Sequence, residues 1–125
     1  MEAYRSSNYV CPSLRHNWTI GAPTGGHRGA ILGAWNPYSQ RQSLWRNLRA
    51  DRQLKQRLAR EISKTPRSVW CGCASWWEHH YFAPGLDPRT ACRIAGWMRQ
   101  NAWLWLDGRR VCLVYCAGRR ATRAA

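Results

Sequence analysis

The chain has 125 residues, enough for one domain with its own hydrophobic core, and 20 basic against 6 acidic residues give a formal net charge of +14. No apolar run approaches the roughly 20 residues that cross a bilayer, and the first residues lack the basic and apolar regions of a secretory signal. We therefore expect a cytoplasmic protein with no membrane span and with reduced cysteines.

The first part of the chain predicts three short strands. They are expected over residues 4–11, 18–20 and 28–35, where apolar and aromatic residues lie between Gly and Pro. The Gly-rich loop that precedes the third strand is not followed by Gly-Lys-Ser/Thr, which excludes a phosphate-binding P-loop. The third strand should end before Pro37, because proline lacks an N–H group and favours an extended residue before it.

A long helix is expected over residues 39–62. Ser39 and Gln42 have the S-x-x-Q spacing of a capping box, which predicts a helix that begins at Ser39. At about 100° per residue, one face of this helix is apolar, with Trp45 at its edge. The apolar face consists of Leu44, Leu48, Leu54, Leu58 and Ile62.

The opposite face of the same helix is a basic stripe about 25 Å long. Only Asp51 and Glu61 are acidic on this helix, whereas solvated helix faces usually mix charges of both signs. The stripe consists of Arg46, Arg49, Arg57, Arg60 and Lys64. It is either an ordinary solvated face or a surface whose mutual repulsion is relieved by a bound anion.

The second part of the chain predicts strands, a helix and a hairpin. Residues 69–82 are strand-like and aromatic, with a break expected at Gly72. Asp87 should cap the next helix, which Asn101 should end in a left-handed conformation. Asp107-Gly108 should then turn a C-terminal β-hairpin.

This order of elements predicts an α+β fold. We expect an antiparallel or mixed sheet with two main helices packed mostly on one face, followed by the C-terminal hairpin. The chain should form a single domain over residues 1–117, with a basic tail at residues 118–125.

Two polar motifs resemble those of a known family. The first is Ala34-Trp35-Asn36-Pro37 and the second is Gln100-Asn101-Ala102. Between and beside them, Ser39, Ser43, Asn47, Glu78, Gly85, Ala91 and Ala95 follow the family's order and spacing. Over roughly residues 4–115 the chain resembles the bacterial family called domain of unknown function 3293. This resemblance implies a small α+β domain of the bacterial cytoplasm and no established activity.

The polar residues of both motifs form a candidate ligand rim. Because both motifs lie at junctions of helix and strand, we expect them to meet in the fold. The rim consists of Trp35, Asn36, Pro37, Ser39, Ser43, Asn47, Glu78, Gln100 and Asn101. The alternative is that these residues only cap and brace the junctions.

A metal site and an active site are both disfavoured. Cys71, Cys73, His79 and His80 are potential zinc ligands, but C-x-C is an unusual zinc spacing, and adjacent histidines in a strand point to opposite faces. We expect no metal and no cofactor. An enzyme would use Glu78 with His79 or His80 as acid and base. Because no nucleophile, base and orienting group have a recognisable spacing, the sequence favours a non-catalytic protein.

The positive charge favours a partner that is a polyanion. The first expectation is a nucleic-acid-binding accessory protein, for RNA or single strands rather than a specific duplex. The basic stripe would contact phosphates, while Tyr38, Trp45, Trp76 and Trp77 would stack on unpaired bases. The alternative is an interaction module or inhibitor that docks on an acidic protein surface.

Overall fold

The computed structural model describes residues 7–116. In chain order the elements are β1 (Asn8–Cys11), the 3₁₀ turn η1 (Pro12–Leu14), β2 (His16–Trp18), β3 (Arg28–Gly33), the 3₁₀ turn η2 (Pro37–Ser39), α2 (Leu44–Glu61), β4 (Arg67–Cys73), β5 (Trp76–Pro84), α3 (Pro88–Trp97), β6 (Ala102–Asp107) and β7 (Val111–Tyr115). Residues 4–6 of the first expected strand and the expected basic tail lie outside the described residues.

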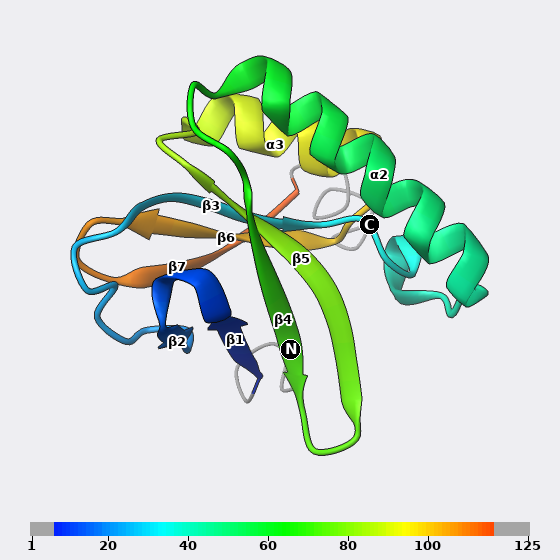
Figure 1. Cartoon of the computed structure of the whole chain (residues 1–125), viewed down its shortest axis with the longest axis horizontal. Helices are drawn as coiled ribbons and strands as arrows, with labels where there is room; N and C mark the ends of the chain where they lie inside the picture. The colour runs from blue at the N-terminus through cyan, green and yellow to red at the C-terminus, as the bar shows by residue number, and fades with distance from the viewer. Residues whose placement is uncertain (1–6, 117–125) are drawn as a thin grey trace, which may run out of the picture.

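The strands form one antiparallel, curled sheet in the order β2-β1-β4-β5-β3-β6-β7. Both helices cover the same face of this sheet, α3 over β3 and β6, and α2 along β5 (Figure 1). The α+β class and the placement of the two helices on one face are therefore confirmed. No helix among residues 7–116 is long and apolar enough to span a membrane.

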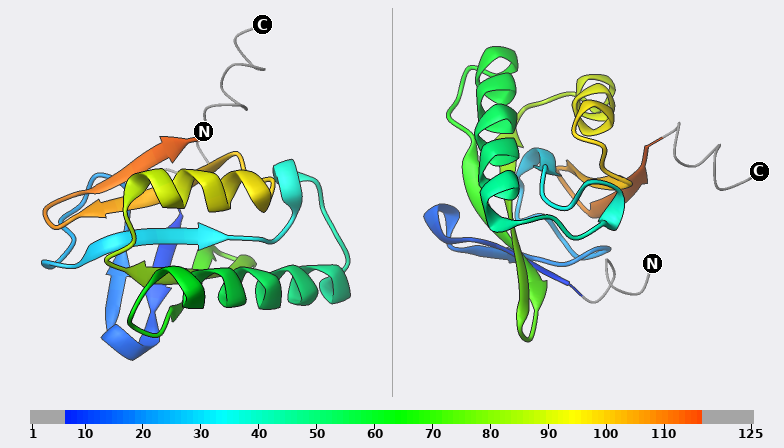
Figure 2. Two further views of the ribbon diagram at one scale, coloured as in Figure 1. Left: turned by 90° about the horizontal axis from the view of Figure 1, so that it is seen from above. Right: turned by 90° about the vertical axis from the view of Figure 1, so that its right-hand side faces the viewer.

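Two apolar clusters lie on the two faces of the sheet. The first joins Leu54 and Leu58 of α2 and Ile94 of α3 to the sheet. The second lies on the opposite face of the sheet, around Trp18 and Phe82. The sheet curls around this face, which is therefore concave (Figure 2). Because both clusters hold large, fully buried side chains, burial on both faces fixes the position of β5 and β3.

The loop after β2 closes the concave face against the C-terminal hairpin. Residues 18–20 were expected to be a strand, but β2 ends at Trp18, and the Ala22 N–H donates to the Thr19 carbonyl in a turn. This turn lets the Gly21 N–H donate to the Val111 carbonyl of β7 at 2.8 Å, and the Val111 N–H donate to the Ala22 carbonyl at 3.0 Å. The predicted strand was wrong because this pairing with β7 favours the turn.

The N-cap of the long helix is Ser43, four residues after the predicted Ser39, and the predicted capping box is wrong. Ser39 has a φ angle of 64°, whereas an N-cap residue needs an extended backbone. Ser43 has φ −63° and ψ 153°, and its Oγ accepts a hydrogen bond from the Arg46 N–H at 3.2 Å. The helix therefore begins after Ser43.

The buried face of α2 also differs from the predicted apolar face. Leu44 and Leu48 are 61% and 46% exposed. Asn47 and Asp51 are buried instead, on the same side as Leu54 and Leu58. In the first half of α2, polar side chains therefore face the sheet and bond to polar partners there. In the second half, leucines face the sheet and pack on the apolar cluster.

Two other boundaries differ from the predictions. The turn between β4 and β5 lies at Ala74-Ser75 rather than at Gly72, which pairs with Trp77. Helix α3 ends at Trp97, and Arg99 rather than Asn101 takes the left-handed conformation, with φ 56°. The N–H groups of Arg99 and Gln100 donate to the carbonyls of Gly96 and Ala95, the pattern of a Schellman motif.

The other helix and turn signals are confirmed. Asp87 caps α3 by accepting a hydrogen bond from the Thr90 N–H at 2.9 Å, with Pro88 in the first turn. Asp107 Oδ1 accepts the backbone N–H groups of Arg109 and Arg110 at 2.7 Å each in the β6–β7 turn. Because these hydrogen bonds stabilise the ionised form of the Asp107 side chain, they lower its pKa.

Candidate functional site

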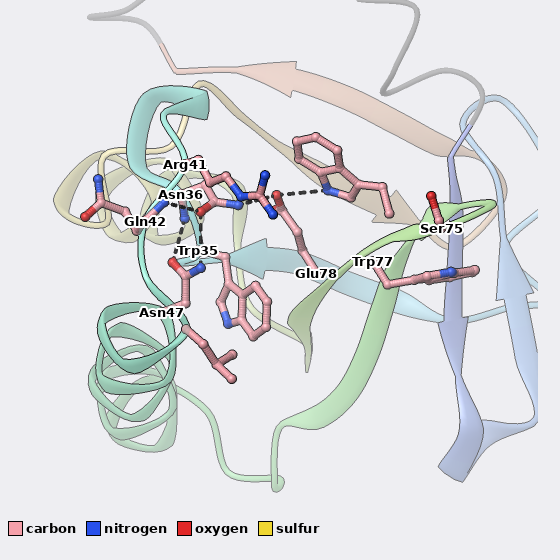
Figure 3. Close-up of a pocket in the computed structure, with 10 residues that line it drawn as sticks. Trp35, Asn36, Arg41, Gln42, Asn47, Ser75, Trp77 and Glu78 are labelled. Carbon is pink, nitrogen blue, oxygen red and sulfur yellow. Dashed lines mark hydrogen bonds between the residues drawn. The ribbon is translucent and has the colours of Figure 1, made fainter.

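A pocket of about 430 Å³ lies between the segment after β3 and the free end of the β4–β5 hairpin (Figure 3). Its volume is in the range of roughly 300–1,000 Å³ typical of small-molecule sites. The pocket is lined by Trp35, Asn36, Arg41, Gln42, Leu44, Asn47, Ser75, Trp76, Trp77 and Glu78. It therefore combines aromatic walls with several amides, one arginine and one carboxylate.

Asn36 is the polar centre of this pocket. Its Oδ1 accepts hydrogen bonds from the Gln42 N–H at 2.8 Å and from Asn47 Nδ2 at 3.1 Å. Its own N–H donates to Asn47 Oδ1 at 2.9 Å, and its Nδ2 donates to Glu78 Oε2 at 2.8 Å. Asn36 has a left-handed backbone, φ 48° and ψ 66°, which asparagine tolerates better than most residues. Four hydrogen bonds thus hold Asn36 in this conformation.

Among residues 7–116, Glu78 provides the only carboxylate that lines the pocket. Its Oε2 accepts hydrogen bonds from Asn36 Nδ2 and from Trp76 Nε1, at 2.8 and 3.2 Å. Within residues 7–116, no Lys or Arg nitrogen lies within 4.0 Å of it. Glu78 is therefore held by neutral donors rather than by an ion pair, which leaves its charge available to a ligand.

The second motif lies directly behind the first, as the sequence predicted. Gln100 Nε2 donates to the Trp35 carbonyl at 3.1 Å, and Asn101 Nδ2 donates to Ser39 Oγ at 2.9 Å. The Tyr38 N–H also donates to the Arg99 carbonyl at 2.7 Å. Gln100 and Asn101 do not line the pocket, so they position the segment that carries Asn36.

The expected rim thus divides into two groups. Four residues line the pocket: Trp35, Asn36, Asn47 and Glu78. The remaining members, Pro37, Ser39, Ser43, Gln100 and Asn101, surround it as a turn, a helix cap and a brace. Figure 3 shows the first group at the junction of β3, α2 and the hairpin.

Sequence reasoning did not assign Arg41, Gln42 and Ser75 to the site. Arg41 and Gln42 were expected inside the long helix, so their place in an extended loop could not be foreseen. Ser43 could have indicated their position, because it is a second N-cap candidate. A helix that begins after Ser43 leaves residues 40–43 in a loop. Trp76 and Trp77 were expected to stack on bases, and both line this pocket.

A second polar feature, a buried hydrogen bond between His79 and Asp51, joins α2 to β5. His79 Nδ1 lies 2.5 Å from Asp51 Oδ2, and both residues are buried. The His79 ring packs between Trp70 and Tyr81, with ring centroids at 4.9 and 4.7 Å. The sequence signal for this pair was a lone aspartate one turn after Asn47 on an arginine-rich helix.

Among residues 7–116, Glu78 is not joined to His79 or His80, the pairing considered above as an acid and a base. Glu78 points into the pocket, whereas His79 points to α2 and bonds to Asp51. His80 lies on the face opposite His79, over Gly33 and at 6.4 Å from the Tyr9 ring. Burial lowers the pKa of His80, against the opposing effect of the Glu78 and Asp51 charges. The structure therefore offers no contact in which Glu78 and a histidine exchange a proton.

The potential zinc ligands are also dispersed. Within residues 7–116 no three His, Cys, Asp or Glu side chains are grouped so that they could hold a metal ion. All six cysteines are free thiols. Burial raises the pKa of Cys71 to about 12, which opposes the thiolate form that binds metals.

The basic stripe is partly interrupted. Arg46, Arg49 and Arg60 are exposed on α2. Arg57 is half-buried, with its guanidinium 4.4 Å above the centre of the Trp97 ring. Lys64 lies beyond the end of the helix, where it lines a separate cavity of about 500 Å³ that also holds Arg28 and Arg67. Three exposed arginines therefore remain close in sequence to the pocket-lining residues 41–47: Arg41, Arg46 and Arg49.

A family model described as "Protein of unknown function (DUF3293)" matches residues 32–103, more than half of the chain, and the chain belongs to this family. The match begins in β3 and ends in β6, so it includes both polar motifs and the pocket between them. No curated protein and no solved structure matches the chain.

Proposed function

We propose that this protein binds single-stranded nucleic acid on the surface formed by the pocket and the first half of α2. The observation that carries this proposal is a group of exposed tryptophans. Trp45 is 70% exposed, Trp76 62%, and Trp70 and Trp77 about 40%. Exposed indole rings are costly in water and are useful where unpaired bases stack, at about 1–3 kcal/mol per base.

Arginines accompany these rings. Arg41 lines the pocket beside Trp76 and Trp77, and Arg46 and Arg49 follow Trp45 on α2. Each exposed guanidinium can bind a phosphate through two hydrogen bonds. Alternating rings and cations fit the alternation of bases and phosphates in a single strand. A duplex hides its base faces in the stack and would use only the arginines.

The cellular setting is part of the proposal. All six thiols are free, which suits the reducing cytoplasm, where RNA is abundant. We propose the bacterial cytoplasm as this setting, as the resemblance of the two polar motifs implies.

The test is a titration of the full chain with labelled 12-nucleotide strands of RNA and DNA, a 12-base-pair duplex and polyglutamate, followed by fluorescence anisotropy at 50 mM salt. We expect a single strand to bind at least tenfold more tightly than the duplex or polyglutamate. The Trp45→Ala and Trp76→Ala changes should each weaken single-strand binding by about 5- to 150-fold, the equivalent of one lost stacking contact.

Trp97→Ala is the matched control. Trp97 is also exposed, at 52%, but Arg57 and Arg93 cover its ring from α2 and α3. This variant should bind like the unchanged protein. Equal binding of single strand, duplex and polyglutamate would overturn the proposal and favour an acidic protein partner. Unchanged binding by the Trp45 and Trp76 variants would also overturn it.

A further inference from the structure

We infer that the pocket recognises the Watson–Crick edge of an unpaired guanine, with Glu78 as the acceptor of its N1–H and N2–H groups. This inference rests on the proposed function and names the base that the pocket selects. It starts from the hydrogen bonds that Glu78 already makes. An ionised carboxylate only accepts hydrogen bonds and has about four acceptor positions.

Both bonds to Glu78 within residues 7–116 reach the same oxygen. Oε2 accepts from Asn36 Nδ2 and from Trp76 Nε1, and no donor among these residues reaches Oε1. The carboxylate therefore presents one free oxygen, with its negative charge, to a pocket whose other walls combine three tryptophans with amides and Arg41. A ligand that enters this end of the pocket must donate hydrogen bonds.

Guanine is the nucleobase whose chemistry fits this requirement. Its Watson–Crick edge presents two adjacent donors, N1–H and the N2 amine, which match the two open acceptor positions of Oε1. Adenine and cytosine place a ring-nitrogen acceptor next to their single amine, and uracil flanks its one N–H with two carbonyls. An acceptor that faces Glu78 would lose a hydrogen bond and meet the negative charge. Single-stranded bases are commonly recognised on this edge.

The site is held in place before a ligand arrives. The Oδ1 atom of Asn36 accepts two donors, so its Nδ2 must face Glu78. Trp76 is fixed by its bond to Glu78, and Trp77 Nε1 donates to the Ala74 carbonyl at 2.9 Å. The aromatic walls and the acceptor therefore need little reordering on binding, which favours selectivity. Arg41 lines the same pocket and supplies a cation for the adjoining phosphate.

The test uses three nine-nucleotide uridine strands that differ only in the central base, which is guanine, inosine or adenine. Inosine keeps the N1–H group but lacks the N2 amine. We expect the guanine strand to bind about 10- to 100-fold more tightly than the inosine strand, because one hydrogen bond to a charged group is lost. Adenine should bind no better than inosine.

Glu78→Gln gives a sharper readout. Asn36 and Trp76 both donate to the same atom, so the glutamine must place its oxygen there and turn its NH₂ group to the ligand. The guanine preference should then disappear, with the guanine and adenine strands bound within about twofold of each other. Glu61→Gln removes the same charge from an exposed site on α2 and should keep the preference.

The outcomes separate the two proposals. If all three strands bind equally tightly, the guanine inference fails while single-strand binding stands. If no strand binds and guanosine monophosphate alone also fails to quench tryptophan fluorescence, both fail. If Glu78→Gln keeps the full guanine preference, another group reads the base and the assignment of Glu78 is wrong.

Discussion

Asn36 and Asn47 exchange two hydrogen bonds across the start of α2: the Asn36 N–H donates to Asn47 Oδ1 at 2.9 Å, and Asn47 Nδ2 returns a bond to Asn36 Oδ1 at 3.1 Å. This exchange ties the end of β3 to the first turn of the helix and closes the loop between them. It also sets the direction of the Asn36 amide, and hence the bond to Glu78.

Asn47→Ala should therefore lower both stability and binding. Asn47 is only 5% exposed, and its loss leaves the Asn36 N–H without its partner. We expect the free energy of unfolding in urea to fall by about 1–3 kcal/mol. Gln53→Ala, an exposed change on the same helix, should stay within about 0.5 kcal/mol. A loss for Asn47→Ala no larger than that would mean that the exchange contributes nothing.

The helix shows how far local sequence signals could reach. The spacing of apolar residues correctly predicted the existence of α2 and its second half. Turn chemistry correctly predicted the β6–β7 turn. The start of α2 was not predicted correctly, because Ser39 and Ser43 are both acceptable caps, and only the turn at Tyr38 and Ser39 decides between them. Periodicity also could not show that Asn47 and Asp51 would be buried in place of Leu44, because their partners come from distant strands.

The candidate site was foreseen in part for the same reason. The meeting of Trp35 with Gln100 followed from the position of both motifs at element junctions. The pocket itself needs the β4–β5 hairpin to bring Glu78 and Trp76 beside Asn36, and the register of that hairpin depends on pairing across the whole sheet. The pattern of residues in the hairpin does not by itself predict this register.

Two partly buried histidines, His80 and His27, predict that the protein loses stability in acid. Burial lowers the pKa of His80, and burial together with His16 lowers the pKa of His27. Below about pH 6.5 the unfolded chain therefore binds more protons than the folded one, and stability falls as the pH falls. We expect the unfolding free energy to drop between pH 7.5 and 5.5, by at most about 1.4 kcal/mol per pH unit from His80 and by less from His27, whose charge is screened by solvent.

His80→Gln provides the check on this pH dependence. The variant should show a smaller difference in unfolding free energy between pH 7.5 and 5.5 than the unchanged protein, because one titrating group is gone. His16→Gln and His27→Gln serve as comparisons, since the centroids of these two rings lie 5.5 Å apart. An undiminished difference in the His80 variant would contradict a role for its burial.

The C-x-C pair should show two very different thiols. The raised pKa of Cys71, about 12, leaves roughly 1 in 10,000 molecules as the thiolate at pH 8. Cys73, two residues away, is exposed. We expect iodoacetamide at pH 8 to label Cys73 in the folded protein and to leave Cys71 unlabelled, as measured by peptide mass spectrometry. Labelling of both in denaturant is the control, and rapid labelling of native Cys71 would contradict its burial.

Salt dependence should distinguish the arginines that contact phosphate from those that brace the fold. If Arg41, Arg46, Arg49 and Arg60 each contact one phosphate, log–log plots of single-strand affinity against salt should have a slope near −3, at about −0.7 per contact. The Arg46→Gln, Arg49→Gln double variant should reduce that slope by about 1.4 and weaken binding to all sequences alike, because phosphates carry no sequence information.

Two comparisons make this last prediction specific. Arg57→Gln should leave the slope almost unchanged and instead lower the unfolding free energy by about 0.5–1 kcal/mol, because the Arg57 guanidinium stacks on Trp97. The Arg89→Gln, Arg109→Gln double variant removes the same charge from the first turn of α3 and from the β6–β7 turn. Both elements lie at the end of the molecule away from the start of α2 (Figure 1). If this control lowers the slope as much as the Arg46, Arg49 variant does, net charge rather than the α2 surface controls binding. A larger effect of the α2 variant assigns the phosphate contacts to that surface.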